Sequence, residues 1–212
     1  MTNESLSIEL REKGDNTELI VEMLIHDLSL IRDTIYGISS NEVRVRYKCA
    51  KVLSKLSKIK PAVLYPYFKF FAKLLDSDNN IIKWNAIDII ANLTEIDTEK
   101  MFEEIFDRYY SLLNEGSLIT AGHIVDNSGK IANVKHNLRE QITINLLGVD
   151  QVPLPTEECR SILSGKAIQA FGQYINHIKN NEAVITFIKR QLKSNRVATR
   201  KKAEKLMIAI QT

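Results

Sequence analysis

The feature that most constrains this chain is an internal repeat of amphipathic helices. In its clearest copy, apolar residues recur at steps of three and four: Ile82, Ala86, Ile89, Ile90 and Leu93. This spacing places them on one face of a helix, and the small Ala86 lets a neighbouring helix approach closely. Asp78 and Asn79 stand just before this run, where their side chains can cap the first free N–H groups.

The same pattern recurs along the chain, and each copy centres its apolar face on one residue. We call these residues the anchors of the repeat: Cys49, Ala86, Ile124, Ala167 and Ala203. Their spacings are 37, 38, 43 and 36 residues. Asn41 is the expected N-terminal cap of the copy that contains Cys49.

A second helix fits between successive anchors in every interval. The expected ranges are 62–76, 98–114, 136–147 and 181–194. The longest interval contains the segment 148–156, whose prolines predict a lengthened loop. Two further helices, over about 17–26 and 28–38, are expected to pair as an N-terminal cap.

Together these elements predict an all-α fold: a right-handed α-α superhelix (HEAT-like solenoid) of about five helix pairs plus an N-terminal helical cap. We expect one domain over 1–212, with the cap in 1–40 and the repeats in 41–212. The chain has only 8 Gly and 4 Pro, too few for the many tight turns of an all-β fold.

Two segments carry a resemblance to a known family. In Asn79–Ala86 a cap is followed by apolar residues, a base and Ala, which is similar to the first-helix signature of HEAT repeats. Ala198–Ala203 is similar as well. The chain therefore resembles HEAT/armadillo-like helical repeat proteins over most of 41–212. The resemblance implies a scaffold that binds other proteins along an extended surface.

Composition sets broad limits on function. Hydrophobic residues make up 44%, and the net charge of +3 is too close to neutral to indicate nucleic acid by itself. Cys49 and Cys159 lie far apart in apolar helical patterns, which is typical of buried thiols. We expect no secretory signal, because the first residues have neither a basic nor an apolar region, and the sequence has no uninterrupted apolar stretch of about 18 residues. We expect a cytoplasmic protein that does not enter a membrane.

No motif for catalysis or metal binding is evident. His123 and Asp126 lie on neighbouring helical turns, but a metal site needs a third ligand. The sequence contains neither a Gly-rich phosphate loop nor a Gly-x-Ser-x-Gly elbow. We therefore expect no enzyme activity, no cofactor and no metal.

A row of basic residues is the first candidate for binding: Arg44, Lys48, Lys51, Lys55 and Lys58. At about 100° per residue the row fits within an arc of about 80°, away from the apolar face of the same helix. It would attract phosphates or an acidic peptide. Alternatively, it pairs with acids of the N-terminal cap such as Glu18, Glu22 or Asp27, because residues 1–40 hold eight acids and three bases.

A second basic group lies near the C-terminus: Lys189, Arg190, Lys193, Arg196, Arg200, Lys201, Lys202 and Lys205. Terminal repeats need a polar outer face, and cations near a helix C-terminus offset its dipole. These two roles favour a structural interpretation of this group, with binding as the alternative.

Trp84 and Asp88 lie one helical turn apart. They are similar to a Trp-Asp-x-x-Asp segment in HEAT-like alkylpurine DNA glycosylases, where the Trp contacts DNA and the Asp helps expel the damaged base. The paired arginines and further aromatic residues of that family have no counterpart that we can place in this chain. The structural alternative is that Trp84 packs against the next repeat.

The leading functional hypothesis is a non-enzymatic protein-interaction module whose partner the sequence does not name. The alternative is nucleic-acid binding through a basic helix face, with a glycosylase-like activity as a remote third. Candidate partner-binding residues are Arg44, Lys48, Lys51, Lys55, Lys58, Trp84 and Asp88.

Overall fold

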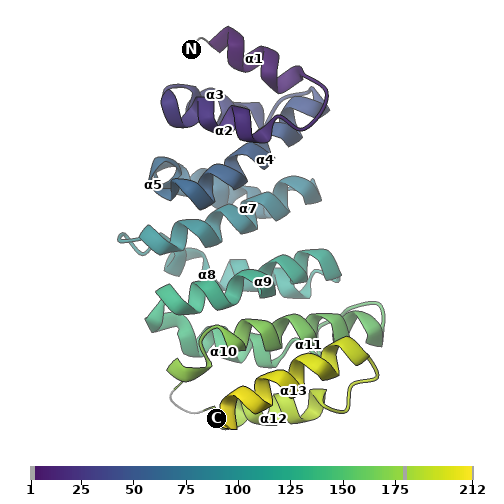
Figure 1. Cartoon of the computed structure of the whole chain (residues 1–212). Coiled ribbons are helices and arrows are strands. Elements are labelled where there is room, and N and C mark those ends of the chain that lie inside the picture. Colours follow the sequence, from purple (N-terminus) through teal and green to yellow (C-terminus); the bar gives the residue numbers. More distant parts are fainter. Residues whose placement is uncertain (1–2, 179–180, 212) are drawn as a thin grey trace. The chain divides into compact units, whose positions relative to one another are not determined.

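The structure, a computed structural model, describes residues 3–178 and 181–211, and its regular elements there are all helical (Figure 1). The predicted domain of 1–212 thus includes five residues outside this description: 1–2, 179–180 and 212. The chain divides into two compact units, Met1–Met101 and Phe102–Thr212. Each unit is described by itself.

Unit 1 opens with three short helices, α1 (Asn3–Arg11), α2 (Thr17–His26) and α3 (Leu30–Gly37), which pack on α4 (Val43–Ile59). The chain returns through α5 (Pro61–Leu64) and α6 (Phe68–Lys73), with 3-10 turns at Tyr65–Tyr67 and Leu74–Asp76. Next, α7 (Asn80–Leu93) packs beside α4 and ends in a 3-10 turn at Thr94–Ile96. Unit 1 therefore contains the cap, one complete helix pair and the first helix of the next pair.

Unit 2 continues the alternation from α8 (Met101–Ser111) and a 3-10 turn at Leu112–Asn114. Its first helices are α9 (Leu118–Val134), α11 (Glu157–Gly172) and α13 (Val197–Gln211), of which α11 packs against both others (Figure 1). Its second helices are α10 (Arg139–Leu147) and α12 (Glu182–Gln191), preceded by 3-10 turns at His136–Leu138 and Ile175–His177. The second helices lie behind the first ones in Figure 1.

The predicted register of the repeat is confirmed. All five anchors are buried, with exposed fractions of 0% for Cys49, Ile124, Ala167 and Ala203 and 1% for Ala86. The four predicted second helices are present, and 148–156 is non-helical. Burial also raises the pKa of the Cys49 thiol to about 12, so this cysteine stays protonated at neutral pH. Cys159 is only half-buried.

Of the two predicted helix caps, Asn79 is confirmed and Asn41 is wrong. Asn79 Oδ1 accepts hydrogen bonds from the backbone N–H groups of Ile81 (3.1 Å) and Ile82 (3.3 Å), as expected. Asn41 does not cap α4, because the N-cap position is Glu42 and no side chain bonds the free N–H groups there. The Ser40 hydroxyl instead accepts from Glu42 N at 3.1 Å, which orders the turn before the helix.

Helix α1 has no counterpart among the predicted elements. It carries only three apolar residues, of which Leu6 and Leu10 are buried and Ile8 is 56% exposed. A pair at a spacing of four is too weak a signal for periodicity analysis. The N-terminal cap therefore has one helix more than predicted, and this helix supplies contacts to the basic row described below.

We predict that enlarging an anchor destabilises the fold. Ala167→Leu should lower the free energy of unfolding by about 1–3 kcal/mol, because the added methyl groups have no space between packed helices. The matched control is Ala198→Leu on the exposed side of α13, which should change it by less than about 0.5 kcal/mol. Urea denaturation measures both. Equal effects would contradict the assigned role of the anchor.

Candidate partner-binding surface

The anchors give the first helices a common numbering, so residues at equal distances from an anchor occupy equivalent faces. We define the outer flank as the positions five and one before the anchor, and two and six after it. On an α-helix these four positions fall within an arc of about 60°. In α4 these positions are Arg44, Lys48, Lys51 and Lys55. The outer flank of the first repeat therefore contains four of the five residues of the predicted basic row. The fifth, Lys58, lies nearly one helical turn beyond Lys55.

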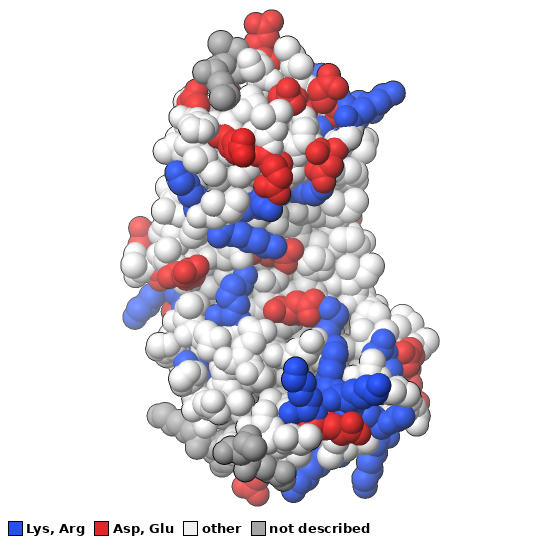
Figure 2. Space-filling model, in the orientation of Figure 1, with Lys and Arg blue, Asp and Glu red and all other residues white. Residues whose placement is uncertain are grey.

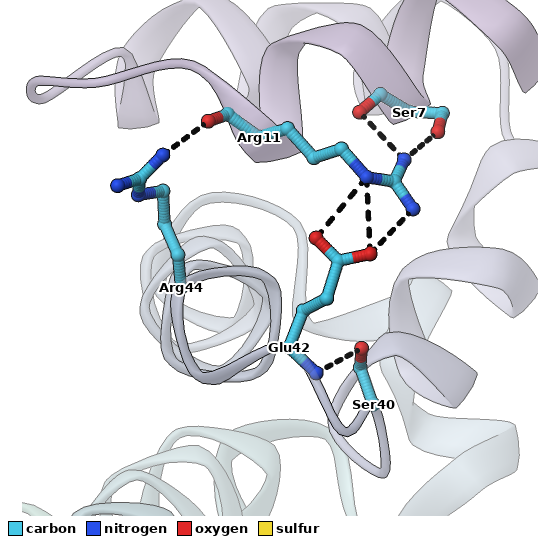
Figure 3. A network of polar contacts seen from close by, with 5 residues as sticks. All are labelled: Ser7, Arg11, Ser40, Glu42 and Arg44. Carbon is cyan, nitrogen blue, oxygen red and sulfur yellow. Dashed lines mark hydrogen bonds and ion pairs between the residues drawn. The ribbon is translucent and has the colours of Figure 1, made fainter.

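The outer flank of α4 binds the chain's own N-terminal segment. Lys48 Nζ donates to the carbonyl oxygens of Glu9 (3.2 Å) and Glu12 (2.8 Å) and to Asn16 Oδ1 (2.6 Å). Arg44 donates to the carbonyl oxygen of Arg11 at 2.9 Å. Figure 3 shows this contact beside a second one, in which the Arg11 guanidinium reaches Glu42 at 2.8 Å.

Two further bases of the row form ion pairs. Lys51 lies 2.7 Å from Asp15 and Lys55 lies 2.6 Å from Glu18. The bond from Lys51, together with hydrogen bonds from the Thr17 hydroxyl and N–H, holds the pKa of the Asp15 carboxyl well below its usual range. All four side chains remain partly exposed, so each ion pair contributes little stability by itself.

The structure thus joins the basic row to the cap, with a partly different set of acids from the one predicted. Glu18 is a partner, as expected. Asp27 instead accepts from the N–H and hydroxyl of Ser29, and within residues 3–178 and 181–211 Glu22 forms no ion pair. Asp15 and backbone carbonyl groups at the end of α1 are the partners of the basic row instead of Glu22 and Asp27. Lys58 makes no hydrogen bond or ion pair with any described residue.

Trp84 and Asp88 lie on α7. Asp88 occupies the outer-flank position two residues after the anchor Ala86, and Trp84 stands two residues before that anchor. Both are half-buried, and both interact with other residues of the chain. The glycosylase-like role of this pair stays a prediction.

In unit 2 the outer flank runs across α9, α11 and α13. One position before the anchors it carries His123, Lys166 and Lys202; two positions after them it carries Asp126, Gln169 and Lys205. Five positions before the anchors it is apolar: Ile119, Ile162 and Ala198. Ile119 is 54% exposed and Ala198 is exposed as well. The flank therefore offers a polar and an apolar row side by side.

The lysines of this flank follow one repeated arrangement. Lys166 forms an ion pair with Asp126 on the preceding first helix, and Lys202 Nζ donates to Gln169 Oε1 at 2.7 Å in the equivalent place. Their aliphatic stems lie across glycines: Lys166 Cε and Lys202 Cδ are each 3.5 Å from where a Cβ would stand at Gly122 and Gly165. A Cβ there would stand at ordinary van der Waals distance from each stem, so both lysines pack closely over the glycine backbone.

The charge of this surface is positive. Burial and the nearby charges of Lys166 and Arg196 lower the pKa of Lys202, against the opposing effect of Asp126. Figure 2 shows Lys and Arg gathered over α11 and α13. Arg196 pairs with Glu158 at 2.8 Å, whereas Lys201 and Lys205 form no ion pair with any residue that the structure describes.

The remaining bases of the C-terminal group lie on or after α12. Arg190 pairs with Asp150 at 2.8 Å, and Arg200 donates to the carbonyl oxygens of Ser194 and Asn195. Lys189 and Lys193 have no ion-pair partner in the described part of the chain. The sequence pattern favours the row at 44–58 as the candidate site and does not include this group. Of the two basic groups, this one nevertheless holds more bases without an ion pair within the described residues, and Lys58 is the one in the row at 44–58 that has neither a hydrogen bond nor an ion pair there.

Other kinds of site find no support in the described residues. No group of three or more His, Cys, Asp and Glu side chains among them could hold a metal ion, and no helix there has the length and apolar character needed to cross a bilayer. A cavity of about 550 Å³ lies beside α10, and His136 and His177 are among its lining residues. His136 Nε2 is 2.7 Å from the carbonyl oxygen of Asn133, a local contact near the end of α9.

Comparison with known proteins shows the fold. No family model and no curated protein matches the sequence. A designed armadillo repeat protein in complex with the peptide (KR)4 is similar in structure, with a TM-score of 0.63, 16% identity and coverage of 98% of this chain and 90% of that one. A second designed armadillo repeat protein gives 0.61, 15% identity and coverage of 97% and 98%. An engineered protein gives 0.59, 16% identity and coverage of 100% and 97%.

We predict that Lys48 anchors the N-terminal segment. Lys48→Met keeps an apolar stem but removes three hydrogen bonds, and it should lower the free energy of unfolding by about 1–2 kcal/mol. Hydrogen exchange of the α1 amides should become faster at the same time. Lys58→Met, on the same helix, removes no contact within the described residues and should change stability by less than about 0.5 kcal/mol. Equal exchange rates in both variants would refute this role.

Proposed function

We propose that this armadillo/HEAT-like repeat protein is a non-enzymatic protein-interaction module, and that it binds partners on the outer flank of α9, α11 and α13. The observation that carries the proposal is this flank, where equivalent positions on three adjacent helices present an apolar row and a polar row, and where the lysines of α13 form no ion pair with any described residue. A surface that repeats from helix to helix suits an extended chain. A cytoplasmic location is part of the proposal.

The solved structure of the designed armadillo repeat protein is compatible with a protein-interaction function. The designed armadillo repeat protein is in complex with a peptide of alternating Lys and Arg, so the fold can present a surface to an extended polypeptide. At 16% identity the likeness concerns the fold alone. Nucleic acid is the second candidate partner, because the same open bases of α13 would attract phosphates.

A photo-crosslinking experiment tests the proposed surface. A photoreactive amino acid replaces Gln169, which is exposed on the outer flank of α11, and in a matched control it replaces Gln141, which is exposed on α10. Irradiation in extract of the source cells should join a polypeptide at position 169 and not at position 141. Equal crosslinking at both positions would contradict the proposal. Crosslinks at 169 that disappear on nuclease treatment would favour nucleic acid.

A further inference from the structure

The chain itself shows what an outer flank of this kind can bind. In α4, all four flank positions are basic, and their side chains hold residues 9–18. That segment carries four acids, at positions 9, 12, 15 and 18. The contacts combine ion pairs to the carboxylates of Asp15 and Glu18 with hydrogen bonds to backbone carbonyl oxygens at the end of α1 and in the turn after it. The outer flank of α4 is thus already occupied from within the chain.

The outer flank of α11 and α13 keeps the basic character, and no segment within residues 3–178 and 181–211 occupies it as residues 9–18 occupy the flank of α4. Lys166 and Lys202 stand at the position of Lys48, one residue before the anchor, and Lys205 stands at the position of Lys51. Of these, Lys166 has a carboxylate partner, Asp126. Lys202 bonds the neutral amide of Gln169, and Lys205 has no ion-pair partner among the described residues. Within the described residues, these two ammonium groups therefore form no ion pair.

We infer that the outer flank of α11 and α13 binds an acidic, extended segment of a partner protein, whose carboxylates meet Lys202 and Lys205. The inference rests on the proposed function and adds the chemical class of the partner. Apolar side chains of the same segment lie on Ile162 and Ala198, the apolar row beside the lysines. Gln169 and Gln173, both exposed, can bond the peptide backbone of the segment.

Helix spacing sets the pattern of such a segment. Packed helices lie about 8–10 Å apart, and an extended chain advances about 3.3 Å per residue. One step from α11 to α13 therefore corresponds to about three residues of the bound chain. Acids at intervals of three would therefore place one carboxylate beside each helix that the segment crosses.

The same surface suits nucleic acid less well. Single strands bind on aromatic side chains that stack on the bases, and no outer-flank position of α9, α11 or α13 carries Phe, Tyr or Trp. A bound duplex would place its charged phosphates against the apolar row of Ile119, Ile162 and Ala198, which has no polar group to bind them. An acidic polypeptide uses both rows, and so the observations favour it.

The test is fluorescence anisotropy with the full chain and synthetic peptides of about twelve residues, long enough to cross three helices. One peptide carries Glu at every third position among Leu and Ser; the two controls carry Gln or Lys at those positions. The Glu peptide alone should bind in about 50 mM salt, and its affinity should fall as salt rises. Absence of binding by the Glu peptide, or equal binding of all three, would overturn the inference.

Charge reversal locates the site. Lys202→Glu with Lys205→Glu should weaken binding of the Glu peptide about tenfold or more, because two attractive contacts become repulsive. Lys189→Glu with Lys193→Glu makes the same change in net charge at the α12 side and should weaken it less than about threefold. Equal losses would indicate unspecific attraction and overturn the inference. If the variant with both charge reversals does not fold, the double variant Lys202→Gln with Lys205→Gln tests the same site. Thermal melting checks that each variant is folded.

Two further outcomes separate the alternatives. Single-stranded or duplex DNA or RNA of equal charge that binds more tightly than the Glu peptide, with the same loss on reversal of Lys202 and Lys205, would overturn the inference in favour of nucleic acid. Crosslinking of a polypeptide at position 169, combined with no affinity for the Glu peptide, would leave the proposed function standing and remove the acidic partner. The two failures are therefore distinguishable.

Discussion

The burial of one anchor residue in each first helix is the interaction on which the other features depend. Within unit 2, α11 is packed between α9 and α13, and a small residue such as Ala167 allows that close approach. Because an α-helix has a fixed period, burial of the anchor also decides which residues face outward. The outer flank is a direct consequence of this packing.

Equivalent outer flanks make different contacts in the two units. In α4 the flank fastens the N-terminal cap, and there its lysines bind carbonyl oxygens and carboxylates of one short segment. In α11 and α13 a lysine at the same position reaches only to the preceding helix, and its stem packs closely over a glycine there. The same chemistry stabilises the fold in unit 1 and leaves cationic groups exposed in unit 2.

The fold alone does not identify a partner. Solved structures with about 16% identity share the helical repeat, and one of them is in complex with a strongly basic peptide. The charge of the flank in α11 and α13 has the sign that attracts acidic partners. A shared helical architecture leaves the surface side chains free to differ, so the individual residues of the flank decide which partners it attracts.

The sequence by itself determined the repeat and its register. Cys49, Ala86, Ile124, Ala167 and Ala203 could be identified because helical periodicity is local, and each buried face is written into fewer than twenty consecutive residues. The second helices and the loop at 148–156 followed from the same spacing. The short α1 was missed because two buried leucines carry too little periodic signal, and Asn41 was misplaced as a cap because helix ends depend on backbone geometry.

Only the tertiary structure decided which bases are available. Lys48 and Lys51 find their partners 32 to 39 residues away, and no local pattern says which acid will fold back onto which base. The sequence is compatible with both pairing and binding for the row at 44–58, and it favours a structural role for the C-terminal group. The structure pairs the former with the cap and leaves Lys201 and Lys205 without an ion pair in the described residues. Charge pairing between distant segments is a property of the packed chain.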